Sequence, residues 1–119
     1  MFFIYGFPSL QLTVVNVSNN TDKIINELLF NYEGSMAEDV VMRNLKAHTN
    51  KQTGISTIHL KDNTNIMMYN NFNGQTHSYI LKPDAINPGT AVKYSGVIYI
   101  NINNIKENGE LELSIKIDE

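Results

Sequence analysis

The chain has 119 residues, a formal net charge of −3 and no cysteine. This length suffices for a hydrophobic core, and we predict a single domain over residues 1–119. The lack of cysteine excludes disulfides, zinc–thiolate sites and thiol catalysis. Arg43 is the only arginine and no two lysines are adjacent. We therefore expect no nucleic-acid surface and no polybasic membrane patch.

The first segment, residues 1–8, is apolar and uncharged, with Phe2, Phe3, Tyr5 and Phe7 close together. It is too short to span a bilayer, so we expect no membrane insertion, and it lacks the basic start and cleavage site of a secretory signal. One interpretation is a first strand that ends at Pro8. Such an apolar cluster also usually marks a contact, which predicts strand addition to a partner or to a second copy, giving a homodimer. The absence of cysteine fits the cytoplasm or, if a leader was trimmed, an extracytoplasmic compartment.

Two alternating segments follow and predict a hairpin with a longer loop. In the first, Leu10, Leu12 and Val14 form an apolar face opposite a mixed face. Turn-forming residues fill 18–22 and end this strand. Alternation resumes at Ile24 and stops before Gly34.

Residues 35–47 give conflicting signals. Ser35 followed by Glu38 matches a capping box and predicts a short helix around 36–47. The apolar side chains of this segment, however, would spread around most of a helix instead of forming one stripe. We favour a turn followed by a strand at about 40–46, and the helix remains the alternative. Residues 48–54 read as a polar loop.

The last stretch, Val97 to Ile117, contains two alternating runs around Asn108-Gly109. This dipeptide predicts a two-residue type I′ turn, in which both central residues have positive φ. The resulting register pairs Ile102 with Ile115 and places one aliphatic face toward the core. The members of that face are Ile98, Ile100, Ile102, Leu111, Leu113, Ile115 and Ile117.

Further short runs at 55–60, 66–69, 77–82 and 91–94 bring the total to about seven to nine strands, with turn signals about every ten residues. This spacing predicts an all-β fold, an antiparallel immunoglobulin-like (Greek-key) β-sandwich. A small barrel or jelly roll is the alternative. Frequent asparagine and isoleucine indicate an AT-rich genome, bacterial or phage.

The residues give weak support to an enzyme. The histidines, His48, His59 and His77, show no His-x-His or His-x-x-x-His spacing, and there is no nucleophile elbow or glycine-rich phosphate loop. A small metal-dependent enzyme or hydrolase that uses His59 and His77 with a carboxylate stays the alternative. We expect no catalytic residue, no metal and no cofactor.

Residues 67–79 combine aromatic rings with side-chain amides, as sugar-binding and partner-binding loops do. The alternative is that Met67 and Tyr69 fill the core and 70–75 is an ordinary hairpin loop. We predict a non-enzymatic module that recognises a protein or glycan through loops and edge strands. The candidate ligand-binding residues are Tyr69, Asn71, Phe72, Asn73, His77 and Tyr79.

Overall fold

The computed structural model describes residues 12–33, 39–56, 65–82 and 96–118, and these contain eight β-strands and no helix. The predicted all-β class is confirmed, and within the described part of 35–47 the predicted strand is present at 40–45. The strands are β1 (Leu12–Asn19), β2 (Ile25–Tyr32), β3 (Val40–Leu45), β4 (Thr49–Ser56), β5 (Ile66–Phe72), β6 (Gln75–Lys82), β7 (Val97–Ile105) and β8 (Leu111–Asp118).

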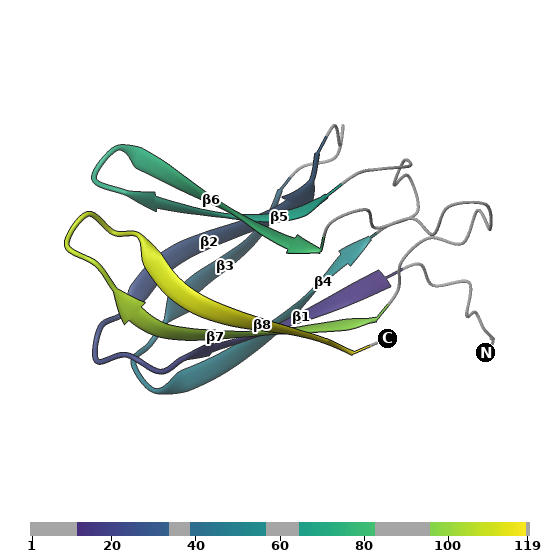
Figure 1. Ribbon diagram of the computed structural model, residues 1–119, viewed down its shortest axis with the longest axis horizontal. Coiled ribbons are helices and arrows are strands. Elements are labelled where there is room, and N and C mark those ends of the chain that lie inside the picture. Colours follow the sequence, from purple (N-terminus) through teal and green to yellow (C-terminus); the bar gives the residue numbers. More distant parts are fainter. Residues whose placement is uncertain (1–11, 34–38, 57–64, 83–95, 119) are drawn as a thin grey trace.

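Two four-stranded sheets lie in two layers, in a sandwich-like arrangement (Figure 1). The first sheet has the order β4-β1-β7-β8 and the second β3-β2-β5-β6. Buried side chains of both sheets form one hydrophobic cluster. Its fully enclosed members include Val15, Val17, Ile98, Ile100 and Ile102 from the first sheet and Leu28, Phe30, Met68 and Leu81 from the second.

The predicted hairpin between the first two described strands is wrong. β1 lies in the first sheet and β2 in the second, because the turn after Asn19 carries the chain from one layer to the other. β1 pairs antiparallel with β4 and parallel with β7, so the first sheet is mixed and not purely antiparallel. The inward face of β1 is the mixed face, with Thr13, Val15, Val17 and Asn19 all buried.

β4 starts earlier than predicted, at Thr49, inside the stretch that reads as a polar loop. Its residues from Thr49 to Gln52 are exposed. β4 lies at the edge of its sheet and pairs with β1 alone in that sheet. Edge strands often carry polar and charged side chains, which protect the open edge. Because of this polar composition, six of the eight residues of β4 read as a loop in the sequence.

The terminal hairpin has the predicted inward face but a different turn and register. Gly109 has φ +89° whereas Asn108 is not among the residues with positive φ. The Gly109 N–H donates to the Lys106 carbonyl at 2.9 Å and the Lys106 N–H donates to the Glu110 carbonyl at 2.8 Å. These bonds describe a three-residue loop with a type I turn and a left-handed glycine. A bulge after Ile102 shifts the pairing, so that Ile102 faces Leu113.

The two-residue turn with two positive φ angles occurs instead at Asn73 (φ 49°) and Gly74 (φ 81°). These residues join β5 to β6, and Phe72 pairs with Gln75 across the turn. At Gly109 the ring of Phe72 is so close that an added Cβ would lie 2.2 Å from its Cγ. The same Asn-Gly dipeptide therefore forms different turns at its two positions in the chain, and the turn that departs from the prediction is the one where Phe72 packs on Gly109.

Candidate binding site

Four turns lie at one end of the molecule, between β1 and β2, β3 and β4, β5 and β6, and β7 and β8 (Figure 1). We call this the loop end. Side chains of the second sheet bind the β7–β8 loop of the first sheet here. The Asn70 amide donates to the Gly109 carbonyl at 2.8 Å, and the Leu111 N–H donates to the Tyr79 hydroxyl oxygen at 2.7 Å. His77 Nε2 lies 3.0 Å from the Asn108 carbonyl oxygen. Side chains of β5 and β6 therefore tie the β7–β8 hairpin of the first sheet to the second sheet.

Tyr79 and Tyr69 have raised pKa values for different reasons. Burial raises the pKa of the Tyr79 phenol from its ordinary value of 10.0, and the hydrogen bond from the Leu111 backbone opposes this effect. Burial is also the largest cause for Tyr69, where the carboxylates of Asp39 and Glu33 raise the pKa further. Both phenols therefore stay protonated at neutral pH, and Tyr79 accepts a backbone hydrogen bond as a neutral group.

The six residues predicted to bind a ligand do not share one surface. Phe72 packs against Gly109, and His77 and Tyr79 contact the β7–β8 loop, as described above. Tyr69 pairs with Leu29 and Ser78 and is half-buried, whereas Asn71 and Asn73 are exposed at the hairpin tip. Met68 belongs to the core cluster, and Met67 is also buried, at 7% exposure, whereas Tyr69 is half-buried. A ligand-binding role for the six residues stays a prediction.

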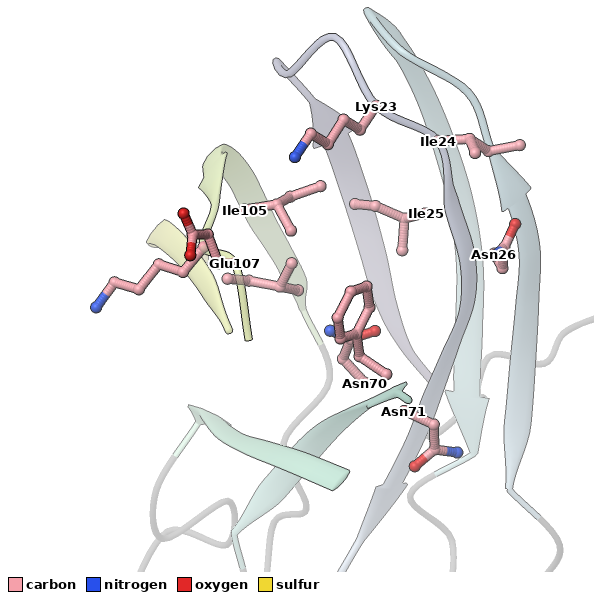
Figure 2. A pocket seen from close by; sticks show the side chains of 11 residues that line it. Lys23, Ile24, Ile25, Asn26, Asn70, Asn71, Ile105 and Glu107 are labelled. Carbon is pink, nitrogen blue, oxygen red and sulfur yellow. The ribbon is translucent and has the colours of Figure 1, made fainter. Parts of the chain in front are cut away.

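The loop end contains a small hollow of about 120 Å³ between the β1–β2 turn, the end of β5 and the β7–β8 loop (Figure 2). We call it the loop-end hollow. Ile25 and Leu111 are almost fully buried, at 4% and 5% exposure, whereas Ile24 is 49% exposed. Figure 2 shows Ile25 and Ile105 pointing toward one another across the opening. The lining residues are Lys23, Ile24, Ile25, Asn26, Asn70, Asn71, Phe72, Ile105, Lys106, Glu107 and Leu111.

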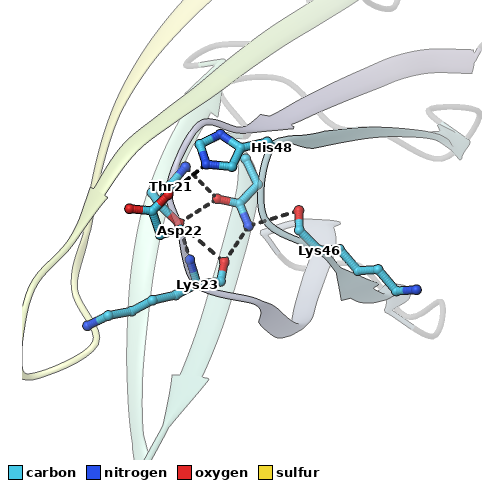
Figure 3. A network of polar contacts seen from close by, with 6 residues as sticks. Thr21, Asp22, Lys23, Lys46 and His48 are labelled. Carbon is cyan, nitrogen blue, oxygen red and sulfur yellow. Dashed lines mark hydrogen bonds and ion pairs between the residues drawn. The ribbon is translucent and has the colours of Figure 1, made fainter.

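One wall of the hollow is fixed by the buried side chain of Asn19. Figure 3 shows the network of polar contacts that includes Thr21 and Lys23 of the β1–β2 turn. The Asn19 Nδ2 donates to the carbonyl of Lys23 at 2.7 Å, in the β1–β2 turn, and to that of Leu45 at 3.1 Å, at the end of β3. Its Oδ1 accepts hydrogen bonds from the Thr21 N–H at 3.0 Å and the Thr21 hydroxyl at 2.7 Å. A buried amide with this many partners sets the conformation of the β1–β2 turn, and hence the position of Lys23 and Ile24.

Sequence reasoning missed Asn19, Asn70 and Ile105 as parts of this end of the molecule. Asn19 stands in a run of turn formers, a signal for a turn that says nothing about burial. Asn70 lies between Tyr69 and Asn71 in the sequence. The only indication that its side chain points inward is that it is two positions from Met68 on the same strand, and therefore on the same face. Ile24, two residues after the turn formers, is 49% exposed, and no sequence pattern distinguished it from the buried Ile25.

The histidines are not brought together in the described part of the chain. No group of three histidine, cysteine or acidic side chains suitable for a metal ion occurs among the described residues. His48 Nε2 lies 2.7 Å from Asp22 at the surface, far along the chain from His77. His59, and the predicted partner segment with Phe2, Phe3, Tyr5 and Phe7, lie outside the described residues.

Comparison with protein-family models finds no match, and comparison with curated proteins finds none either. No helix among the described residues is long and apolar enough to cross a membrane. The chain is similar to a solved NMR structure of a protein from Eubacterium rectale, with a TM-score of 0.53 and 13% identity over 97% of this chain and 98% of that one. At this identity the likeness shows the fold alone, and it covers almost the whole of both chains.

Proposed function

We propose that the protein is a non-enzymatic binding module that accepts one apolar side chain of a protein partner in the loop-end hollow. The observation that carries the proposal is a preformed hollow with an apolar floor and a polar rim. Its volume of about 120 Å³ is below the ~300–1,000 Å³ of typical small-molecule sites. It matches one anchoring side chain of a larger partner, the usual form of an interaction hot spot.

The chemistry of the rim supports a peptide ligand. Lys23, Lys106 and Glu107 are exposed at the edge of the hollow, and Asn71 adds an exposed amide. An amide and charges of both signs complement the N–H and carbonyl groups that flank any protein side chain. Burying a leucine or phenylalanine side chain on the floor would contribute roughly 1.5–3 kcal/mol.

The walls of the hollow are held before any ligand arrives. Asn19 fixes the β1–β2 turn, and Asn70 with Tyr79 fixes the β7–β8 loop. Preorganisation of this kind lowers the entropic cost of binding, because the loops need not be ordered by the partner. The loop end therefore suits a recognition surface on a rigid scaffold.

We infer in addition an immunoglobulin-like Greek-key connection of the two sheets. In support, the chain changes sheet after β1, β3, β4 and β6, and it forms hairpins within a sheet at β2–β3, β5–β6 and β7–β8. Such sandwiches place connecting loops at their two ends, which agrees with a binding role for the loop end. A bacterial or phage origin, inferred from composition, is part of the same proposal.

The proposal is tested by methyl NMR with N-acetyl-leucinamide as the probe and N-acetyl-glycinamide as the control ligand. We expect saturable shifts at the methyl groups of Ile25 and Ile105 with the leucine probe only. Ile105→Ala should weaken the binding, because its side chain points across the opening (Figure 2), whereas Ile80→Ala, at an exposed position of β6, should not. Shifts that do not saturate, or equal weakening by both substitutions, would contradict the proposal.

A further inference from the structure

The outer face of the first sheet carries a second, larger hollow that is independent of the loop end. Its volume is about 310 Å³, within the range of ~300–1,000 Å³ typical of ligand sites. Strands β1, β7 and β8 form it, on the side of the sheet that faces away from the core. We call it the sheet-face hollow. Its lining residues are Asn16, Ser18, Tyr99, Ile100, Asn101, Lys116 and Asp118.

Strand register brings these polar side chains into two neighbouring rows. Asn16 pairs with Tyr99 across the parallel β1–β7 ladder, and Tyr99 pairs with Lys116 on β8. The next row pairs Ser18 with Asn101. Residues of one row lie at the strand spacing of about 4.8 Å, so the groups form a continuous polar surface across three strands.

One side of this surface is fixed by a hydrogen-bonded network. The Asn50 amide donates to Ser18 Oγ at 3.1 Å and also to Asn16 Oδ1. Asn16 in turn donates to Gln52 Oε1 at 3.4 Å. These contacts restrict the side chains of Asn16 and Ser18 before a ligand binds, which lowers the cost of ordering them.

The other side of the surface has unused hydrogen-bonding capacity. Within the described part of the chain, the side chains of Tyr99, Asn101, Lys116 and Asp118 form no hydrogen bond or ion pair with one another or with their neighbours. Together they offer an ammonium donor, a carboxylate acceptor, and an amide and a phenol that do both. Hydroxyl groups, which donate and accept, match this mixture.

The aromatic ring and the charge balance narrow the ligand class. Tyr99 is 38% exposed and is the only one of the exposed large hydrophobic side chains of the described residues that lies on this face. A half-exposed ring flanked by polar groups can pack against the C–H surface of a sugar while its hydroxyl remains available. Lys116 and Asp118 cancel in charge, whereas a phosphate or nucleic-acid site would need an excess of positive charge.

We propose that the sheet-face hollow binds a neutral oligosaccharide, which packs on the ring of Tyr99 and exchanges hydrogen bonds with Asn101, Lys116 and Asp118. This site does not depend on the loop-end hollow. The two sites use no residue in common and take ligands of different chemistry.

The test is titration of the isotopically labelled full chain with cellotetraose, chitotetraose and mannotetraose, followed by backbone amide NMR. We expect at least one of them to give saturable shifts at Tyr99, Asn101 and Lys116, with little change at Ile24 and Ile105. Tyr99→Ala should weaken that binding by several-fold, up to about ten-fold, whereas Tyr99→Phe should retain most of it because the ring remains. Ile80→Ala, which removes an exposed apolar side chain from the other sheet, is the control and should bind as the unaltered chain does.

Three results would overturn the proposal. The first is an absence of saturable shifts with all three sugars. The second is equal binding by the Tyr99→Ala variant and the unaltered chain, which would remove the ring from the site. The third is stronger binding of a sulfated tetrasaccharide than of any neutral one, which would assign the face to an anion. None of these results bears on the leucine probe at the loop end, so the two proposals fail separately.

Discussion

The side-chain amide of Asn70 donates a hydrogen bond of 2.8 Å to the backbone carbonyl of Gly109, joining the end of β5 in one sheet to the β7–β8 loop of the other. Asn70 is 6% exposed and Gly109 is also buried. A buried carbonyl that loses its partner retains the full cost of its desolvation. This contact therefore links the stability of the fold to the shape of the loop-end hollow.

Asn70→Ala should lower the free energy of unfolding by about 1–3 kcal/mol, because it leaves the Gly109 carbonyl buried without a donor. Asn71→Ala is the control, since the adjacent Asn71 is exposed and its substitution should change stability by less than about 0.5 kcal/mol. Urea unfolding measures both. Equal losses in the two variants would contradict a special role for the Asn70 contact.

Gly109→Ala should destabilise the protein more than Gly74→Ala. Both glycines have positive φ, +89° and +81°, so alanine is strained at either position by roughly 1–3 kcal/mol. Only at Gly109 would the new Cβ overlap another side chain, at 2.2 Å from Phe72 Cγ, whereas no atom lies within 4 Å at Gly74. Overpacking should add about 1–3 kcal/mol there.

Thermal unfolding of the two glycine variants separates strain from overlap. Combining Gly109→Ala with Phe72→Ala should cost less than the sum of the two single changes, because the second change removes the overlapping ring. Additive losses would show that Phe72 does not limit residue 109.

Ile102→Asn should cost several kcal/mol, because it buries an amide without partners at a position that is 0% exposed. Ile115→Asn, on the same inward face but only half-buried on the edge strand β8, should cost less. Ser114→Val, on the exposed outer face, should be nearly neutral. Urea unfolding measures the three losses, and a different order would contradict the assignment of the inward face of the hairpin.

The stability of the fold should decrease at alkaline pH. Burial raises the pKa of Tyr79 above its ordinary 10.0, and burial with nearby carboxylates does the same for Tyr69. A raised folded-state pKa means that the stabilisation is complete below the unfolded pKa and is lost as the pH rises through the folded value. Unfolding measured from neutral pH upward should show this loss beginning near pH 10, with a shallower slope in Tyr79→Phe. An unchanged slope in that variant would contradict the assignment to Tyr79.

Removal of residues 1–8 tests the predicted partner segment, which lies outside the described residues. We expect the full chain to associate with itself, and a chain that begins at Ser9 to sediment as a monomer, because the apolar cluster of five residues within six positions favours contact over solvation. Monomers of equal solubility in both cases would exclude this role.

The sequence by itself determined the all-β class, the approximate strand positions and the inward face of the terminal hairpin. Alternation reports which face of a strand is buried, and Ile98, Ile100 and Ile102 are indeed enclosed. The same reasoning missed the first six of the eight residues of β4, because an edge strand can be polar on most of its surface. Alternation is a property of one strand alone, so the buried face can be inferred without knowing which strands pair with it.

Only the tertiary structure decided which strands meet, in which register, and where side chains converge. The parallel pairing of β1 with β7 joins segments about eighty residues apart, and no local pattern encodes it. The turn at Asn108-Gly109 differs from the turn at Asn73-Gly74. At Gly109, the packing of Phe72 from the other sheet adds a constraint that Gly74 does not have. Likewise Asn19 and Asn70 are buried because backbone carbonyls from distant segments satisfy their amides. Both hollows arise between such distant segments, and for that reason their residues could not be grouped from the sequence.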